Sequence, residues 1–191
     1  MPASAIPYLT PEQYLTIERE SVDRHEYYRG QMQAMAGGTP EHSCINTNVA
    51  GGLWQRLLGK TCAVHTQNMR LSVGRGDLYT YPDVMVVCGV PRFLDHLQDV
   101  ILNPVAIIEI LSASTEAYDR DRKFMLCRGL ESLQEYVLIS QAEPIVERFT
   151  RQVSGKWDLI TWAGLDQTMR LDSIDCDLPL AQIYEKVKLE D

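Results

Sequence analysis

The chain has 191 residues, of which 45% are hydrophobic and 23% are charged, so it is long enough to bury a substantial core. Its formal net charge of −8 argues against a protein that coats nucleic acid nonspecifically, although the acidic excess lies mostly in residues 131–191 and leaves room for a local basic groove. No run approaches the roughly 18 apolar residues of a membrane span, and the first residues lack the features of a signal peptide. We therefore expect a cytoplasmic protein with a single domain over residues 1–191 and no membrane partner.

Two helices with β structure between them are predicted for the first third of the chain. Each helix opens with a threonine that can cap it, followed by a proline that suits the first helical position. The first is short and ends near residue 19, and the second covers about 40–59, with apolar residues at four-residue spacing. Residues 25–35 are typical of two β segments around Arg29-Gly30.

Six strands and two helices are predicted for the rest of the chain. Residues 63–73 alternate toward their end, as a half-buried strand does, whereas residues 81–89 and 104–111 are continuous apolar runs typical of central strands. The remaining predicted elements are a helix at about 117–129, strands at 135–140, 144–150 and 156–163, and a short helix at 180–187. This order favours an α/β domain in which helices pack against a mixed sheet.

The cysteines are predicted to be reduced and mostly buried thiols. They are odd in number and form no CxxC pair, a pattern that favours neither a disulfide framework nor a zinc site. The five are Cys44, Cys62, Cys88, Cys127 and Cys176.

Two acidic residues stand in the apolar strands. Asp83 is predicted to lie one residue into its strand, and Glu109 lies within the run Val105–Leu111. A carboxylate in such a place is costly unless it is paired, hydrogen-bonded or bound to a cation. If the two strands are neighbours, the two acids make a hard-oxygen site for magnesium, which takes few protein carboxylates and keeps several waters. The alternative is that each acid lies at a strand end or pairs with an arginine.

Lys123 is the third candidate. It precedes the inward-facing Phe124 on the predicted helix, so it would lean over the sheet toward Glu109 and orient or deprotonate a water, or stabilise charge on a phosphate. It also follows Asp119 by four residues, which is the spacing of an ordinary surface ion pair. The sequence favours neither interpretation over the other.

Several segments of the chain resemble the bacterial "putative restriction endonuclease" family within the PD-(D/E)xK nuclease superfamily. They are HEYYRGQMQAMAGGTPEH, YPDVMVV, NPVAIIEILSAST, YDRDRKF and LQEYVLI. The resemblance covers most of the chain, and the combined pattern is specific. It implies a restriction-endonuclease-like α/β fold, a mixed β-sheet flanked by helices, and an endonuclease that hydrolyses phosphodiester bonds with the help of a metal.

The resemblance also implies roles for individual residues. Asp83 matches the aspartate of the Pro-Asp motif and Glu109 the second acid, and together with the carbonyl of Ile110 they would hold magnesium, with manganese as the alternative. The lysine that the superfamily places two residues after the second acid is Leu111 here, so Lys123 on the next helix becomes the candidate. The implied partner is nucleic acid, with DNA favoured, and a homodimer would serve an enzyme that cuts both strands of a symmetric site.

Three further residues are supporting candidates. Glu41 and His42 lie in the first turn of the predicted helix 40–59, where related nucleases often place another acid, and Glu26 lies in the family-like segment before it. Each has a structural alternative: Glu41 interacts with the helix dipole, His42 borders the core, and Glu26 is a strand residue beside Arg29.

The residues around these candidates admit more than one role. Ser112, Ser114 and Thr115 either cap the next helix, which is the favoured role, or hydrogen-bond a phosphate. Arg120 and Arg122 either grip a nucleic-acid backbone or pair with the aspartates beside them. Two rival functions remain as hypotheses. One is a noncatalytic protein that keeps the nuclease fold for binding or assembly, and the other is a metal-dependent hydrolase with a different substrate.

Overall fold

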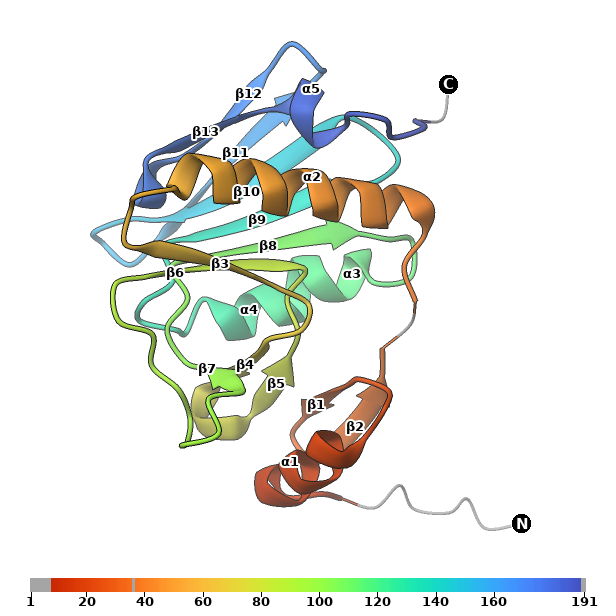
Figure 1. Ribbon diagram of the computed structural model, residues 1–191, viewed down its shortest axis with the longest axis vertical. Coiled ribbons are helices and arrows are strands. Elements are labelled where there is room, and N and C mark those ends of the chain that lie inside the picture. The colour runs from red at the N-terminus through yellow and green to blue at the C-terminus, as the bar shows by residue number, and fades with distance from the viewer. Residues whose placement is uncertain (1–7, 36, 190–191) are drawn as a thin grey trace.

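A six-stranded mixed sheet has α2 (Pro40–Leu57) on one face and the helical segment of residues 116–127 on the other (Figure 1). The computed structural model describes residues 8–35 and 37–189. In spatial order the strands are β11 (Trp157–Ala163), β10 (Ile145–Arg151), β9 (Glu135–Ser140), β8 (Ala106–Leu111), β6 (Val84–Cys88) and β3 (Cys62–Thr66). Within this sheet only β8 and β9 pair parallel and the other neighbours pair antiparallel, so the expected mixed sheet flanked by helices is confirmed.

A smaller, five-stranded sheet packs with α1 (Pro11–Glu20) and lies below the larger sheet in Figure 1. Its order is β2 (Gln31–Ala34), β1 (His25–Tyr28), β5 (Leu78–Thr80), β4 (Arg70–Val73) and β7 (Val100–Ile101). A hairpin of β12 (Thr168–Leu171) and β13 (Cys176–Pro179) precedes α5 (Leu180–Ile183). No helix among residues 8–35 and 37–189 is long and apolar enough to cross a membrane.

The period of two along β8 decides which side chains face which helix. Ile108 and Ile110 belong to the hydrophobic cluster beneath α2, and Ile107 and Leu111 belong to the cluster on the opposite face. Glu109 therefore points to the same face as Ile107 and Leu111, toward residues 116–127. That is why a carboxylate in an otherwise apolar strand can meet a side chain from the following helical segment.

Three structural predictions are wrong in detail. Residues 63–73 do not form one strand, because a turn closed by the Met69 N–H and the Thr66 carbonyl sends β3 and β4 into different sheets. The short strands β5, β7, β12 and β13, of two to four residues, were not predicted. The helix expected at 117–129 consists of α3 (Glu116–Tyr118), a π turn (Asp119–Lys123) and α4 (Phe124–Cys127).

The expectation that all cysteines are reduced is wrong for one pair. Cys62 and Cys88 are directly opposite each other across the antiparallel strands β3 and β6, and they form a disulfide. Their separation of 26 residues hid this proximity, which only the pairing of the strands creates. Cys127 and Cys176 are free and buried, and Cys44 is free and half-buried.

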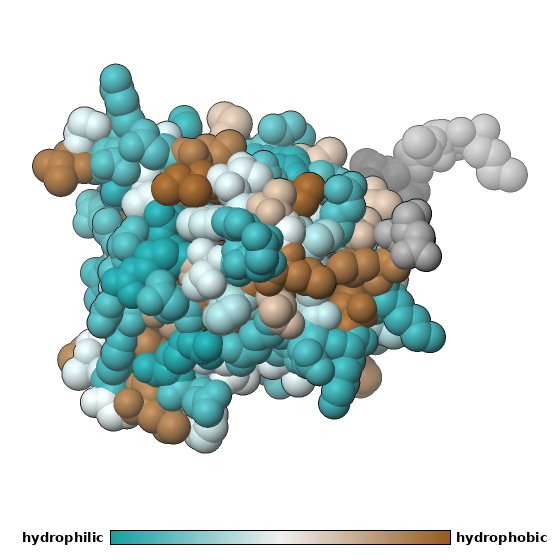
Figure 2. Space-filling model, turned by 90° about the horizontal axis from the view of Figure 1, so that it is seen from above, coloured by the Kyte–Doolittle hydropathy of each residue, from teal (hydrophilic) through white to brown (hydrophobic). Residues whose placement is uncertain are grey.

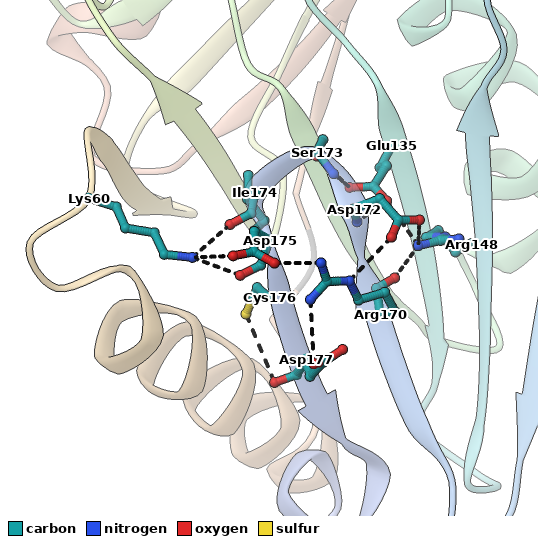
Figure 3. A network of polar contacts seen from close by, with 10 residues as sticks. All are labelled: Lys60, Glu135, Arg148, Arg170, Asp172, Ser173, Ile174, Asp175, Cys176 and Asp177. Carbon is teal, nitrogen blue, oxygen red and sulfur yellow. Dashed lines mark hydrogen bonds and ion pairs between the residues drawn. The ribbon is translucent and has the colours of Figure 1, made fainter.

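The hairpin is fixed to the larger sheet by a buried ionic cluster (Figure 3). Glu135 on β9 is fully buried and lies 3.1 Å from the Arg148 guanidinium on β10. Its carboxylate also accepts hydrogen bonds from the backbone N–H groups of Asp172 and Ser173, in the turn that joins β12 to β13. A carboxylate inside the protein thus satisfies donors from two segments that are distant in sequence.

Two adjacent glycines in α2 give a matched test of packing. Gly51 is exposed with open space around it, whereas a Cβ on Gly52 would lie 2.7 Å from Leu178 Cδ1. We expect Gly51→Ala to stabilise the protein by about 1 kcal/mol, because alanine is the better helix former. The Gly52→Ala variant should have a free energy of unfolding about 1–3 kcal/mol lower than the Gly51→Ala variant, because the added methyl group overpacks the contact with the hairpin. Urea unfolding measures both, and equal effects would contradict this.

Candidate functional site

The two strand-borne acids meet at the point where β6 begins. Val84 pairs with Ile108 across β6 and β8, so the residue before β6 lies beside Glu109. Asp83 immediately precedes β6 rather than lying one residue inside it, and its backbone N–H lies 3.4 Å from Glu109 Oε2. The two acids are 9% and 2% exposed. Neighbouring strands therefore bring them together, which was the condition for a shared site.

Asp83 is held by hydrogen bonds on both carboxylate oxygens. Oδ2 accepts from the Ile110 N–H at 2.7 Å and lies 3.2 Å from His42 Nε2, and Oδ1 accepts from the Gln67 side-chain amide at 2.6 Å. Burial opposes ionisation, but the contact with His42 and the Ile110 N–H outweigh it, so the pKa of Asp83 lies below its ordinary value. The same contact with Asp83 outweighs burial at His42 and raises the pKa of the imidazole. Asp83 is therefore a carboxylate in a fixed orientation.

Lys123 lies in the interior and not at the surface. It is 4% exposed, at the end of the π turn, and its Nζ is 2.9 Å from Glu109 Oε1. Two more carboxylates surround it, Glu26 at 3.3 Å and Asp119 at 3.6 Å. The interpretation as an exposed surface ion pair is therefore wrong, since both Asp119 and Lys123 are buried.

Negative charge exceeds positive charge around Lys123. Burial lowers the pKa of its ammonium, but Glu109, Glu26 and Asp119 outweigh this and raise that pKa well above its ordinary value. Burial, together with the charges of Asp119 and Asp83, raises the pKa of Glu109 well above its own ordinary value, against the opposing effect of Lys123. One ammonium thus serves several carboxylates, an arrangement that favours an additional cation.

The supporting candidates divide into two groups. Glu26 on β1 joins the site from the smaller sheet, where it contacts Lys123 and also accepts a hydrogen bond from Thr80. His42 reaches the site from the first turn of α2 through Asp83. Glu41 is beside it in the sequence, but its side chain makes no hydrogen bond or ion pair with the described part of the chain.

The surrounding polar residues do not make the intramolecular contacts that were expected of them. The hydroxyl groups at 112–115 bond to one another and give α3 no side-chain cap. Arg120 pairs with Glu116 and Glu147, not with the aspartates beside it. The Arg122 guanidinium lies over the Tyr28 ring, 5.4 Å from its centroid.

Sequence reasoning missed two residues of the site. Asp119 was considered only as a surface partner, and Gln67 lies in the turn that was mistaken for continuous strand. A signal for Asp119 was present in its spacing from Lys123, because two residues four apart on one helix share a face. Nothing in the sequence pattern pointed to Gln67.

The donor set fits a hard divalent cation held partly through water. Among the described residues, no three His, Cys, Asp or Glu side chains are grouped so that they could together hold an ion. Magnesium nevertheless takes only one or two carboxylates and keeps several waters. Glu109 Oε1 is buried and accepts no hydrogen bond from the described residues, although it lies near the Lys123 ammonium. This carboxylate oxygen, whose described neighbour is the Lys123 ammonium, and the fixed Asp83 carboxylate beside it are ligands of the kind that such an ion binds.

Comparison with known proteins identifies the fold and the family. A crystal structure from Anabaena variabilis, described as "a putative nuclease belonging to DUF820", superimposes with a TM-score of 0.77 over 94% of this chain and 99% of that one, at 18% identity. The fold is thus nuclease-like. The profile of the Uma2 family, "Putative restriction endonuclease", matches residues 11–181, and the chain belongs to this family.

Two relatives come from Synechocystis sp. (strain PCC 6803). "Uncharacterized protein slr1290" is 33% identical over 183 residues, which is 96% of this chain and 95% of the relative. "Uncharacterized protein sll1609" is 31% identical over 156 residues, which is 82% of this chain and 88% of that one. The likeness therefore extends over nearly the full length of both relatives.

Proposed function

We propose that this protein is a magnesium- or manganese-dependent endonuclease that hydrolyses phosphodiester bonds of nucleic acid, with DNA as the first substrate to test. The observation that supports it best is the convergence of Asp83 and Glu109, on neighbouring strands, with the single ammonium of Lys123. Membership of the Uma2 family, described as "Putative restriction endonuclease", agrees with this chemistry.

Asp83 and Glu109, with the carbonyl of Ile110, are the groups that would hold the metal ion. When bound, such an ion neutralises charge on the phosphate and lowers the pKa of a coordinated water. The hydrogen bonds from Ile110 and Gln67 keep the Asp83 carboxylate in one orientation, so little reorganisation is needed when the site fills.

Lys123 acts as a charged donor in this proposal. Because the surrounding carboxylates raise its pKa, the side chain is an ammonium at neutral pH and has no free lone pair to accept a proton. It orients the attacking water by donating to it, or stabilises charge that develops on the phosphate. Glu26 and Asp119 are positioning residues, because they contact Lys123 rather than the place of the substrate.

The experiment combines a metal titration with a substrate panel. We expect the purified protein to bind magnesium or manganese in calorimetry at millimolar metal, and to cleave a member of a panel of plasmid DNA, linear duplex, single strands and RNA. Chelation with EDTA should abolish cleavage. Metal binding without nucleic-acid cleavage, but with hydrolysis of small phosphodiesters, would assign a different substrate.

One observation favours a noncatalytic protein with the nuclease fold as the second candidate. Glu109, Asp119 and Lys123 are each no more than 4% exposed, and they are paired with one another as in a structural ion cluster. Absence of metal binding in the calorimetric titration, together with an uncut panel, would favour this candidate over the endonuclease.

A further inference from the structure

The outer edge of the larger sheet is a long strand whose far side has no partner among the described residues. β11 has seven residues and pairs only with β10, and it is longer than β3 at the opposite edge or β2 at the edge of the smaller sheet. Figure 2 shows the molecule from above, with hydrophobic patches set in a largely hydrophilic surface. Leu159 and Ile160 of β11 are 49% and 44% exposed.

The pairing of β11 with β10 shows which main-chain groups are free. The Gly164 N–H donates to the Pro144 carbonyl, and the Gln152 N–H donates to the Lys156 carbonyl. In an antiparallel pair, hydrogen-bonded positions alternate with positions whose N–H and C=O point away. Even-numbered residues of β11 therefore bond to β10. The odd-numbered ones, Trp157, Leu159, Thr161 and Ala163, direct their N–H and C=O groups outward.

Such an edge is normally protected, and β11 lacks the usual protection. Proteins blunt exposed edges with lysine, proline or a bulge. The sequence WDLITWA contains no lysine and no proline, and its seven residues pair with β10 in unbroken register. A regular row of unpaired donors and acceptors, bordered by exposed apolar side chains, is complementary to another β-strand.

We propose that β11 pairs antiparallel with β11 of a second copy of this chain, so that the two larger sheets become one continuous sheet. A two-fold axis at Ile160 places Trp157 opposite Ala163 and Leu159 opposite Thr161 of the other copy. Each outward N–H of one copy then meets an outward C=O of the other, because the axis places odd-numbered residues opposite odd-numbered residues.

The side chains of β11 are compatible with this self-pairing. Asp158 is the only charged residue in the strand, and the axis places it opposite Trp162 rather than opposite its own copy. Like charges directly opposite each other would destabilise the pair, and none meet here. Ile160 meets Ile160 of the other copy as an apolar pair on the axis. The strand is thus self-complementary in main-chain hydrogen bonding and in charge.

Sedimentation analysis at about 100 µM tests the proposal, because even weak specific interfaces of ordinary size associate in the micromolar range. The wild type should be a dimer. Ile160→Lys places two ammonium groups opposite each other at the axis, and it should weaken association by at least about 10-fold. Val153→Lys makes the same change in charge at an exposed residue of the preceding turn and should leave the dimer intact. A monomeric wild type, or a dimer that persists in Ile160→Lys, overturns the proposal.

A cysteine on the axis gives a second test that does not depend on a charge. Residues opposite each other at a non-hydrogen-bonded position have Cα atoms about 4.5 Å apart, a spacing that a disulfide can bridge. The protein already has such a cross-strand bond in Cys62–Cys88. Ile160→Cys should form a covalent dimer on mild oxidation, seen on a non-reducing gel, faster than Val153→Cys or the wild type. Equal rates of cross-linking would overturn the two-fold axis at residue 160.

Discussion

Glu109→Gln should lower metal-dependent cleavage by at least about 100-fold, because it removes a charged oxygen from the place where the metal would bind. The same variant should keep or raise the free energy of unfolding. Glu109 is buried among other carboxylates, so its negative charge is costly in the folded state. When that charge is removed, Lys123 still has Glu26 and Asp119 as partners. Initial rates of cleavage and urea unfolding measure the two effects.

The stability measurement separates the two candidate functions. If Glu109 served only as the structural partner of Lys123, breaking this buried pair would cost about 3–5 kcal/mol. A large loss of stability with unchanged metal binding would therefore contradict the proposed site. Glu143→Gln is the matched control, because it makes the same change at an exposed residue after β9 and should alter neither quantity.

Glu135→Ala should cost about 3–5 kcal/mol in free energy of unfolding, the largest structural effect we expect. The substitution removes the only fully buried carboxylate that pairs with Arg148 among the described residues, leaves that guanidinium the more exposed Asp172, and orphans the N–H groups of Asp172 and Ser173. Arg148 is only 4% exposed, so water cannot replace the lost contact without movement of the hairpin.

A double variant and a surface variant complete this test. Glu135→Leu combined with Arg148→Met should be more stable than Glu135→Ala, because it removes the buried guanidinium together with the buried carboxylate. Asp177→Ala removes a half-exposed ion pair on the same hairpin and should change stability by no more than about 0.5 kcal/mol. If all three variants unfold at the same urea concentration, the buried cluster does not fix the hairpin.

The sequence predicted the acids of the candidate site because the apolar residues on either side of them indicate buried strands. A carboxylate within Val105–Leu111 has to be compensated, and this requirement holds whatever the strand pairs with. The approach of Asp83 to Glu109 was conditional on β6 and β8 being adjacent. Strand order is set by contacts between distant segments, so the sequence could state the condition but not show that it is met.

What the sequence did not predict depends on these distant contacts. The disulfide exists because Cys62 and Cys88 face each other across paired strands, and Gln67 reaches Asp83 because a turn separates β3 from β4. The buried cluster at Glu135 likewise joins segments 37 residues apart. Local patterns of hydrophobicity do not indicate which distant residues will be in contact.

The π turn at residues 119–123 has a consequence for comparing this chain with its relatives. A π turn holds one more residue than an α turn without lengthening the helix by a turn, so it behaves as a local insertion. Beyond the π turn, α4 buries Phe124 and Cys127, and an extra residue before them changes which side chain reaches β8. A relative that lacks one residue here would align well on either side yet present a different residue to the carboxylates. Gaps in an alignment of this segment therefore carry information about the site.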